Sequence, residues 1–220
     1  MSRLYGDAHR ALQDQFHTRK MADRIEGLAV TTEFEPEVRA FIESRDMFFL
    51  STVDQAGRPT VSYKGGETGF VRVIGEGELA FPSYDGNGMY YSMGNIAENR
   101  QVGMLFIDFE KPHRIRLQGV ASVSLDDPLK DQWQEAELVV RVRVSELWRN
   151  CPRYIHRYQK VKQSRYVPKD ACETPIATWK RTDAVQDVLR PHEAEQVKRS
   201  GGEITIEEWI EQVQSGDENA

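Results

Sequence analysis

Apolar and polar residues alternate along several short stretches in the middle of this chain. In residues 114–124, Ile115 and Leu117 fall on one face of an extended chain, and Arg114 and Arg116 fall on the other. A period of two residues is typical of a strand with one buried face. Further strands are expected over residues 58–64, 70–74, 78–81 and 140–145.

Two nearly continuous apolar runs, at residues 47–53 and 102–109, lack this alternation. Such runs predict strands that are buried on both faces. Residues 54–57, Asp-Gln-Ala-Gly, are a turn signal, so the first run and residues 58–64 are expected to pair as a hairpin. Six or seven strands with one inserted helix indicate a closed or nearly closed antiparallel barrel, and an open α+β sheet is the alternative.

Helical patterns lie on both sides of these strands. Residues 4–28 predict a polar helix with Leu12 and Phe16 among its few apolar anchors, and Pro36 begins a short amphipathic helix. Residues 149–163 predict a basic helix. The expected parts are therefore an N-terminal helical extension (1–34), a barrel domain (35–163), and a C-terminal extension (164–220) that packs on the barrel or on a partner and ends in a disordered tail (216–220).

The stretch between residues 81 and 96 joins a strand to a helix through a glycine-rich turn. Gly86 and Gly88 flank Asn87, which lets the backbone take positive φ angles and approach a ligand closely. A helix that begins at or near Asn87 has unpaired N–H groups at its positive dipole end, where phosphate is the usual occupant. A plain turn without a ligand is the alternative, since Asp-Gly and Asn-Gly also mark ordinary turns.

Composition narrows the class of protein. The 220 residues carry a net charge of -6, which argues against nucleic acid as a partner. No apolar run is long enough to span a bilayer and no secretion signal opens the sequence, so a cytoplasmic protein without membrane attachment is expected. Cys151 and Cys172 match neither a metal-binding pattern nor a disulfide framework, so no metal site is expected.

Two side chains in the basic segment carry reactive groups. Cys151, near the expected helix start, is a candidate reactive thiol, and the alternative is a packed small residue. His156 is a candidate proton donor to a substrate, and the alternative is a solvated helix residue.

Four segments occur in an order that is similar to a known family. They are Met47–Val53 with the following Asp-Gln-Ala-Gly-Arg-Pro, Gly86-Asn87 followed by Ser92 and Asn95-Ile96, Val102–Asp108, and Arg114–Gly119. Together they resemble the pyridoxamine 5'-phosphate oxidase-like family of FMN-binding split barrels over about residues 35–160, and Asn150–Ile155 is similar to a segment of one uncharacterised branch. The resemblance implies a mainly β fold with flanking helices, a six-stranded antiparallel split β-barrel, and a homodimer with FMN in clefts between the subunits.

The resemblance also implies a set of cofactor-binding residues. Ser62, Tyr63 and Lys64 match the strand beside the flavin ring, and Ser83 and Tyr84 match the strand end near the ribityl chain. The segment that binds the phosphate corresponds to Asn87, Gly88, Met89, Ser92 and Asn95. On a later strand, Arg114 and Arg116 match the place from which a polar side chain reaches the cofactor.

The chain departs from the family pattern at two places. Many relatives carry an arginine pair or an Arg-Lys pair in the phosphate segment, where this chain has Gly-Met at 88–89 and Tyr-Ser at 91–92. Backbone amides, helped by Lys64 or Arg116, are then expected to bind the phosphate. Each missing charge-assisted contact is worth roughly 1.5–3 kcal/mol of binding free energy. The oxidase's arginine- and tryptophan-containing C-terminal motif is not recognisable, so pyridoxamine phosphate is not the expected substrate.

These features together predict an FMN-binding flavoprotein, an oxidoreductase acting on an unknown small molecule. Lys64 is the expected donor near the N1/C2=O edge of the flavin. A protein that binds FMN, a deazaflavin or haem without turnover is the alternative from a different class. A barrel that has lost its site and serves only for interaction is a third possibility.

Overall fold

The computed structural model describes residues 2–170, 172–217 and 219–220. By its internal contacts the chain separates into two units, Met1–Val161 and Lys162–Ala220. The expected bounds of the three parts and the packing of the C-terminal extension stay predictions. The expected disorder of residues 216–220 also stays a prediction, and residue 218 of that tail lies outside the described residues.

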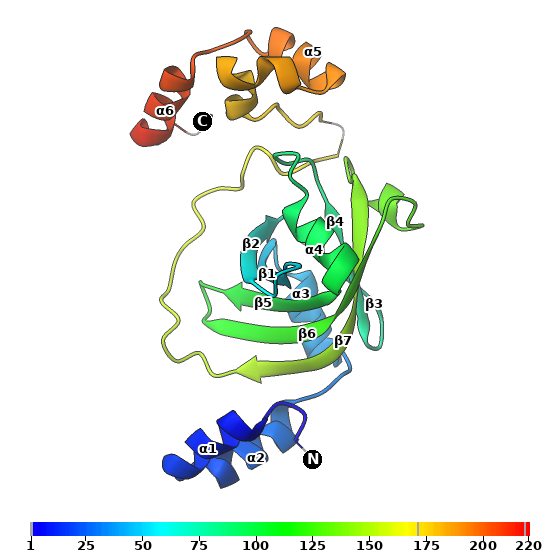
Figure 1. Cartoon of the computed structure of the whole chain (residues 1–220), viewed down its shortest axis with the longest axis vertical. Coiled ribbons are helices and arrows are strands. Elements are labelled where there is room, and N and C mark those ends of the chain that lie inside the picture. The colour runs from blue at the N-terminus through cyan, green and yellow to red at the C-terminus, as the bar shows by residue number, and fades with distance from the viewer. Residues whose placement is uncertain (1, 171, 218) are drawn as a thin grey trace. The chain divides into compact units, whose positions relative to one another are not determined.

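Within the described residues, seven strands form one sheet in the first unit (Figure 1). They are β1 (Met47–Val53), β2 (Pro59–Gly65), β3 (Arg72–Gly75), β4 (Glu78–Ser83), β5 (Gln101–Asp108), β6 (His113–Ser124) and β7 (Leu138–Asn150). Their order across the sheet is β2-β1-β5-β6-β7-β4-β3, and every pair is antiparallel. The expected hairpin of β1 and β2 is confirmed, and the short β3 adds a seventh strand by pairing with β4.

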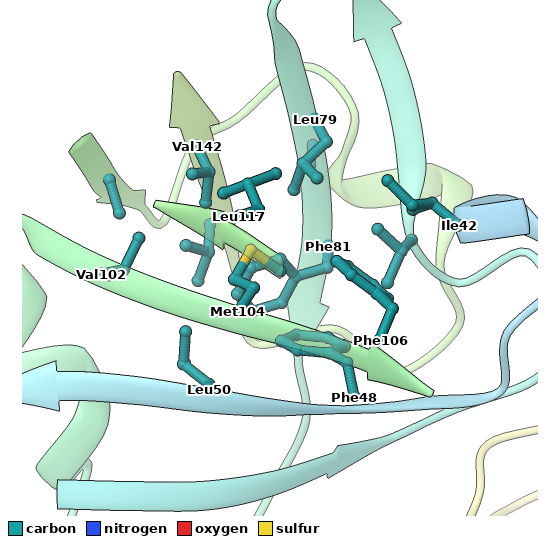
Figure 2. Close-up of a cluster of buried hydrophobic side chains, with 14 of the residues drawn as sticks. Ile42, Phe48, Leu50, Leu79, Phe81, Val102, Met104, Phe106, Leu117 and Val142 are labelled. Atoms are coloured by element: carbon teal, nitrogen blue, oxygen red, sulfur yellow. The ribbon is translucent and has the colours of Figure 1, made fainter. Parts of the chain in front are cut away.

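The sheet curls around a core of aromatic and aliphatic side chains (Figure 2). Phe48 of β1 packs edge-on against Phe81 of β4, with ring centroids 4.9 Å apart, and its ring lies 5.2 Å from that of Phe106 in β5. All three rings are fully buried. Burying one such side chain contributes roughly 1.5–3 kcal/mol, so these contacts hold together strands that are distant in sequence.

Both long apolar runs alternate in burial, contrary to the expectation that they are covered on two faces. In β1, Phe48, Leu50 and Thr52 are buried, whereas Phe49 and Ser51 are only half-buried. The same alternation occurs in β5. The prediction was wrong because apolar side chains also lie on the outer face of an antiparallel sheet, where they stay partly exposed.

Helices lie before, between and after the strands. They are α1 (Asp7–Gln15), α2 (Arg19–Ala29), α3 (Pro36–Glu43), α4 (Tyr91–Asn99), α5 (Pro191–Arg199) and α6 (Ile206–Ser215), with the 3-10 helices η1 (Lys130–Gln132), η2 (Thr178–Arg181) and η3 (Asp183–Val188). The helix expected over residues 4–28 is interrupted at His17, which takes a left-handed φ of 54° between α1 and α2. The short helix at Pro36 is confirmed, and it buries Val38 and Ile42. None of the helices among the described residues has both the length and the apolar character that crossing a bilayer requires.

The basic helix expected over residues 149–163 does not form. Instead β7 continues to Asn150, and the rest of the segment contains neither helix nor strand. In such a helix Arg153, Arg157 and Lys160 would share one side, and like charges three or four residues apart are destabilising.

The second unit contains a buried ion pair. Lys180 Nζ in η2 lies 2.6 Å from Glu193 Oε1 in α5, and the two side chains are 6% and 8% exposed. Arg190 Nη2 lies 2.9 Å from the same oxygen. Burial by itself would raise the pKa of Glu193, but hydrogen bonds from Arg190 and Lys180 outweigh that effect and lower the pKa to about 2. The carboxylate is therefore held ionised within the unit.

Candidate functional site

A cavity of about 350 Å³ lies between β2, the end of β4 and the start of α4, all labelled in Figure 1. It is lined by Thr60, Ser62, Lys64, Ser83, Tyr84, Gly86, Asn87, Gly88, Met89, Tyr90, Tyr91, Ser92 and Met93. Its volume is within the range of small-molecule sites. Two segments that are separate in the sequence, residues 60–64 and residues 83–93, therefore form one candidate site.

The alternation of β2 places three polar side chains on the cavity wall. Thr60, Ser62 and Lys64 are half-buried and line the cavity. Val61 and Tyr63 point to the opposite face of the strand and are 66% and 62% exposed. Because successive side chains of a strand alternate between faces, Ser62 and Lys64 share one side, as the sequence predicted.

The glycine-rich segment forms a turn before α4, and the helix begins later than expected. It starts at Tyr91 instead of near Asn87. Asn87 Oδ1 accepts a hydrogen bond from the backbone N–H of Met89 at 3.1 Å, and Gly88 takes a left-handed φ of 74°. Asparagine and glycine stabilise turns in this way, so a local turn replaces the first expected turn of the helix.

The N-terminal end of α4 faces the cavity, with residues 91–93 in its lining. The first hydrogen bond within the helix runs from the Gly94 N–H to the Tyr90 carbonyl. The three N–H groups before it have no acceptor within the helix, so they and the helix dipole favour an anion at this end of the cavity. Ser92 also contacts β2, since its Oγ lies 3.2 Å from Ser62 Oγ.

Lys64 gives the β2 wall a positive charge. Its side chain is half-buried, and burial lowers the pKa of the ammonium group below its ordinary value. It forms no hydrogen bond or ion pair with any residue that the structure describes, and no carboxylate is among the described lining residues. Because a partly desolvated charge without a partner is unfavourable, this wall is suited to an anionic ligand.

Three tyrosines are among the described residues that line the cavity. Burial raises the pKa of Tyr84 to about 12, so its hydroxyl stays protonated and can donate a hydrogen bond at neutral pH. The Tyr91 hydroxyl donates to Asp54 Oδ2 at 3.3 Å, which ties the start of α4 to the turn after β1. The Tyr90 hydroxyl donates to Glu137 Oε2 at 2.5 Å. These contacts fix the aromatic side of the cavity.

Eight of the twelve site residues predicted from the sequence line this cavity: Ser62, Lys64, Ser83, Tyr84, Asn87, Gly88, Met89 and Ser92. The structure brings these residues together although they come from two separate segments, residues 62–64 and 83–92. Their role in binding a cofactor stays a prediction. The remaining four, Tyr63, Asn95, Arg114 and Arg116, do not line it.

Tyr63 and Asn95 lie elsewhere for identifiable reasons. Tyr63 is on the outer face of β2, where its ring packs edge-on against Phe49 with centroids 6.1 Å apart. Asn95 is on the buried side of α4, where its Nδ2 donates to Thr52 Oγ1 at 3.0 Å. The amide of Asn95 therefore supports the packing of α4 on β1 instead of facing a ligand.

Arg114 and Arg116 lie on the outer face of β6, and the expected alternation with Ile115 and Leu117 is confirmed. The side chain of Arg116 is exposed, next to Trp148 across the strand pair. The Nε of Arg114 is buried without a hydrogen-bond partner among the described residues. Neither arginine can be assigned to the cavity of its own chain.

Sequence reasoning did not single out Thr60, Tyr90 and Tyr91. For Thr60 the signal was present, because it shares the two-residue period of Ser62 and Lys64. The two tyrosines lie at the start of α4, where Tyr90 is the N-cap and Tyr91 the first helical residue, a position that the sequence placed nearer to Asn87.

The two reactive candidates of the basic segment lie outside the cavity. Cys151 is an exposed free thiol, so the alternative of a packed residue is wrong. No helix begins beside it, so the helix start that made it a candidate reactive thiol is absent. His156 is exposed on the same irregular segment.

Several solved structures are similar to this chain. HupZ from Group A Streptococcus is 16% identical, with 52% of this chain and 92% of that chain covered and a TM-score of 0.43. General Stress Protein 26 from Bacillus anthracis is 15% identical, covering 50% of this chain and 88% of that chain with a TM-score of 0.40. HutZ from Vibrio cholerae, described as a heme storage protein, is 23% identical. The match covers 53% of this chain and 94% of that chain, with a TM-score of 0.39.

No curated protein matches the chain. A sequence model of the family described as pyridoxamine 5'-phosphate oxidase matches residues 34–168, which is more than half of the 220 residues. The matched range includes every strand of the sheet and every residue that lines the cavity, within the described part of the chain. The chain therefore belongs to the pyridoxamine 5'-phosphate oxidase family, and its antiparallel sheet is the split barrel of that family.

Proposed function

We propose that the protein is an FMN-binding flavoprotein that acts as an oxidoreductase on a small molecule. One observation carries this proposal. Lys64 presents a half-buried ammonium group, with no partner among the described residues, on the wall of a cavity that lies within the part of the chain matched by the family model. An anionic cofactor would supply the missing counter-charge.

The chemistry of the lining fits a flavin nucleotide. Hydroxyl groups suit the polar ring edge and the ribityl chain, and seven of the described lining side chains carry one: Thr60, Ser62, Ser83, Tyr84, Tyr90, Tyr91 and Ser92. The free N–H groups at the start of α4 suit the phosphate. Because no arginine is among the described lining residues, these amides and Lys64 carry the recognition of the phosphate.

Bound FMN would supply the electron-transfer chemistry, and the residues of this chain would bind and orient it. Lys64 holds a positive charge against the cofactor. Tyr84, whose pKa is raised to about 12, remains a hydrogen-bond donor across the physiological range. The contact between Ser62 and Ser92 fixes β2 against α4, so that the two walls keep a constant separation.

A homodimer in which a second copy completes the site is part of this proposal. Two features of the outer face of the sheet support it. Val61 and Tyr63 are largely exposed although both are apolar in character. Arg114 Nε and Asn150 Oδ1, on paired residues of β6 and β7, are buried without hydrogen-bond partners among the described residues. A partner on this face would cover the apolar side chains and offer hydrogen-bond partners to the polar atoms.

The absorption spectrum of the purified protein tests the cofactor. Bound flavin gives bands in the blue and near ultraviolet, haem gives a Soret band, and an empty barrel gives neither. We expect flavin bands that return when FMN is added to the stripped protein. A protein that takes up haem or a deazaflavin but not FMN would contradict the proposal.

The reaction and the assembly are tested separately. Anaerobic loss of the flavin bands with NADH, NADPH or a candidate substrate separates an oxidoreductase from a protein that only binds FMN. Light scattering that gives a monomer mass at micromolar concentration, with flavin still bound, would contradict the shared site. The cytoplasmic location belongs to the same proposal and is supported by the sequence composition alone.

A further inference from the structure

The hairpin of α1 and α2 carries its large apolar side chains on the outside. Figure 1 shows the two helices side by side near the N-terminus. Five apolar side chains are each more than half exposed: Leu12, Phe16, Met21, Ile25 and Leu28. No residue of either helix is buried. Leu12 and Phe16, expected from the sequence to be apolar anchors, are therefore largely exposed in the described part of the chain.

The contact between the two helices is polar instead. Arg10 of α1 pairs with Asp23 of α2, with Nη1 and Oδ1 2.7 Å apart. In addition, Glu26 of α2 accepts hydrogen bonds from the segment that precedes α1, from the Ser2 hydroxyl at 2.8 Å and from the Arg3 N–H at 2.6 Å. A helix pair in water normally places apolar side chains inside and polar side chains outside. This hairpin has the opposite arrangement.

Such a hairpin needs a cover for its outer face. The helices have nine and eleven residues, and isolated helices shorter than about 12–15 residues are marginal in water. Most helix stability in proteins comes from packing an apolar face, which these helices do not do within the chain. A cluster of exposed large apolar side chains marks an interaction site.

The spacing of the apolar residues indicates a helical partner. Met21, Ile25 and Leu28 of α2 are separated by four and then three residues, which is the spacing of a coiled-coil seam. Leu12 and Phe16, also four residues apart, continue the apolar surface on the first helix. A second helix pair with the same spacing would interlock with this surface.

The charges of the hairpin favour a second copy of itself as that partner. Residues 7–29 contain four cationic and four anionic side chains, so neither a basic nor an acidic partner is favoured by net charge. The formal charge of α1 is -1 and that of α2 is +1. A two-fold arrangement that packs each α1 against the α2 of the other copy brings the opposite net charges of the two helices together.

We propose that α1 and α2 form a self-association surface on which the same hairpin of a second copy packs. Its contact residues are the five exposed apolar side chains defined above. The proposal goes beyond the proposed function, because it concerns neither the cavity nor the outer face of the sheet. It also requires no bound cofactor.

The test uses the full-length chain with Cys151→Ser and Cys172→Ser and one new cysteine. Ile25→Cys places a thiol on the apolar surface, and Lys20→Cys places one on the exposed polar side of the same helix as a matched control. We expect maleimide to label the Ile25→Cys protein about tenfold more slowly than the control at high protein concentration, and dilution to remove the difference. Equal labelling at every concentration would overturn the proposal. Protection that does not change on dilution would also overturn it, because the cover would then belong to the same chain.

A second measurement keeps the test independent of the cysteine variants. Ile25→Glu should weaken self-association, measured by sedimentation equilibrium, by about tenfold or more, since it places a charge in an apolar contact. Ala11→Glu, at an exposed site off the apolar surface, is the control and should have little effect. Neither variant should change the flavin spectrum, so failure of the FMN proposal leaves this result unaffected. Identical self-association of the two variants would overturn the proposal.

Discussion

The Oγ atoms of Ser62 and Ser92 lie 3.2 Å apart and join β2 to the first turn of α4 on the wall of the cavity. Asn95, one turn further along the helix, has its amide 3.0 Å from the Thr52 hydroxyl in the interior. Both side chains are small, polar and on the same helix. The structure nevertheless gives them different tasks, since Ser92 faces a candidate ligand site and Asn95 holds the helix to the sheet.

Asn95→Ala should therefore act on stability. We expect the free energy of unfolding to fall by about 1–3 kcal/mol, because the buried Thr52 hydroxyl loses its partner. Urea unfolding followed by circular dichroism measures the change. Glu98→Ala, exposed on the same helix, is the control. Equal midpoints for the two variants would show that this hydrogen bond does not support the fold.

Ser92→Ala should act on the ligand. If the start of α4 holds the phosphate, FMN affinity should fall by about 1 kcal/mol while riboflavin affinity stays nearly constant, because only FMN carries the phosphate. Fluorescence titration of the stripped protein with each flavin gives the two affinities. Equal losses for both flavins would place this segment against another part of the cofactor.

Lys64→Met should weaken FMN binding by about 1.5–3 kcal/mol, the range for a hydrogen bond to a charged group. Tyr63→Phe, a neighbouring change on the opposite face of β2, is the matched control and should leave binding unchanged. A contact with the ring should also lower the flavin reduction potential on mutation, whereas a contact with the phosphate should not. Wild-type affinity with an unshifted potential would remove Lys64 from the site.

Gly119→Ala should destabilise the barrel. An added Cβ would lie 2.5 Å from the Arg143 carbonyl oxygen, at the point where the register of β6 and β7 shifts. Because a backbone atom cannot move away without disturbing the sheet, we expect a loss of about 1–3 kcal/mol in the free energy of unfolding. At Gly103, on the adjacent β5, the nearest atom to an added Cβ is Ser51 Cβ at 3.6 Å. Gly103→Ala is therefore the control, and thermal unfolding of both variants should separate them.

The ion pair in the second unit predicts a dependence on pH. The pKa of Glu193 is lowered from 4.5 to about 2, so its stabilising effect is complete above pH 4.5 and is lost as the pH falls toward 2. The shift corresponds to about 3 kcal/mol. Hydrogen-exchange protection of α5, corrected for intrinsic rates, should fall between pH 5 and pH 3 in the native chain.

Glu193→Gln should show low protection of α5 at both pH values, because it removes the carboxylate from the buried ion pair with Lys180. Glu195→Gln, exposed on the same helix, should behave as the native chain does. Unchanged protection in the Glu193 variant would show that the pair does not hold the unit together.

The sequence by itself determined those features that depend on neighbouring residues. The two-residue period of β2 placed Ser62 and Lys64 on one face, and Asp-Gln-Ala-Gly at 54–57 specified the hairpin turn. The alternation of Ile115 with Arg114 was likewise confirmed in β6. These predictions succeeded because strand alternation and turn chemistry are set by local sterics and hydrogen bonding.

Where local preferences compete with each other or with distant contacts, only the tertiary structure decided which conformation forms. The local turn at Asn87 displaced the start of α4 to Tyr91, and β7 extended to Asn150 where a helix had been expected. Asn95 left the candidate site because Thr52, 43 residues earlier in the chain, supplies its hydrogen-bond partner in the core. Such outcomes depend on which groups are buried together. That choice is made by the packing of segments far apart in sequence, and no short stretch of residues contains it.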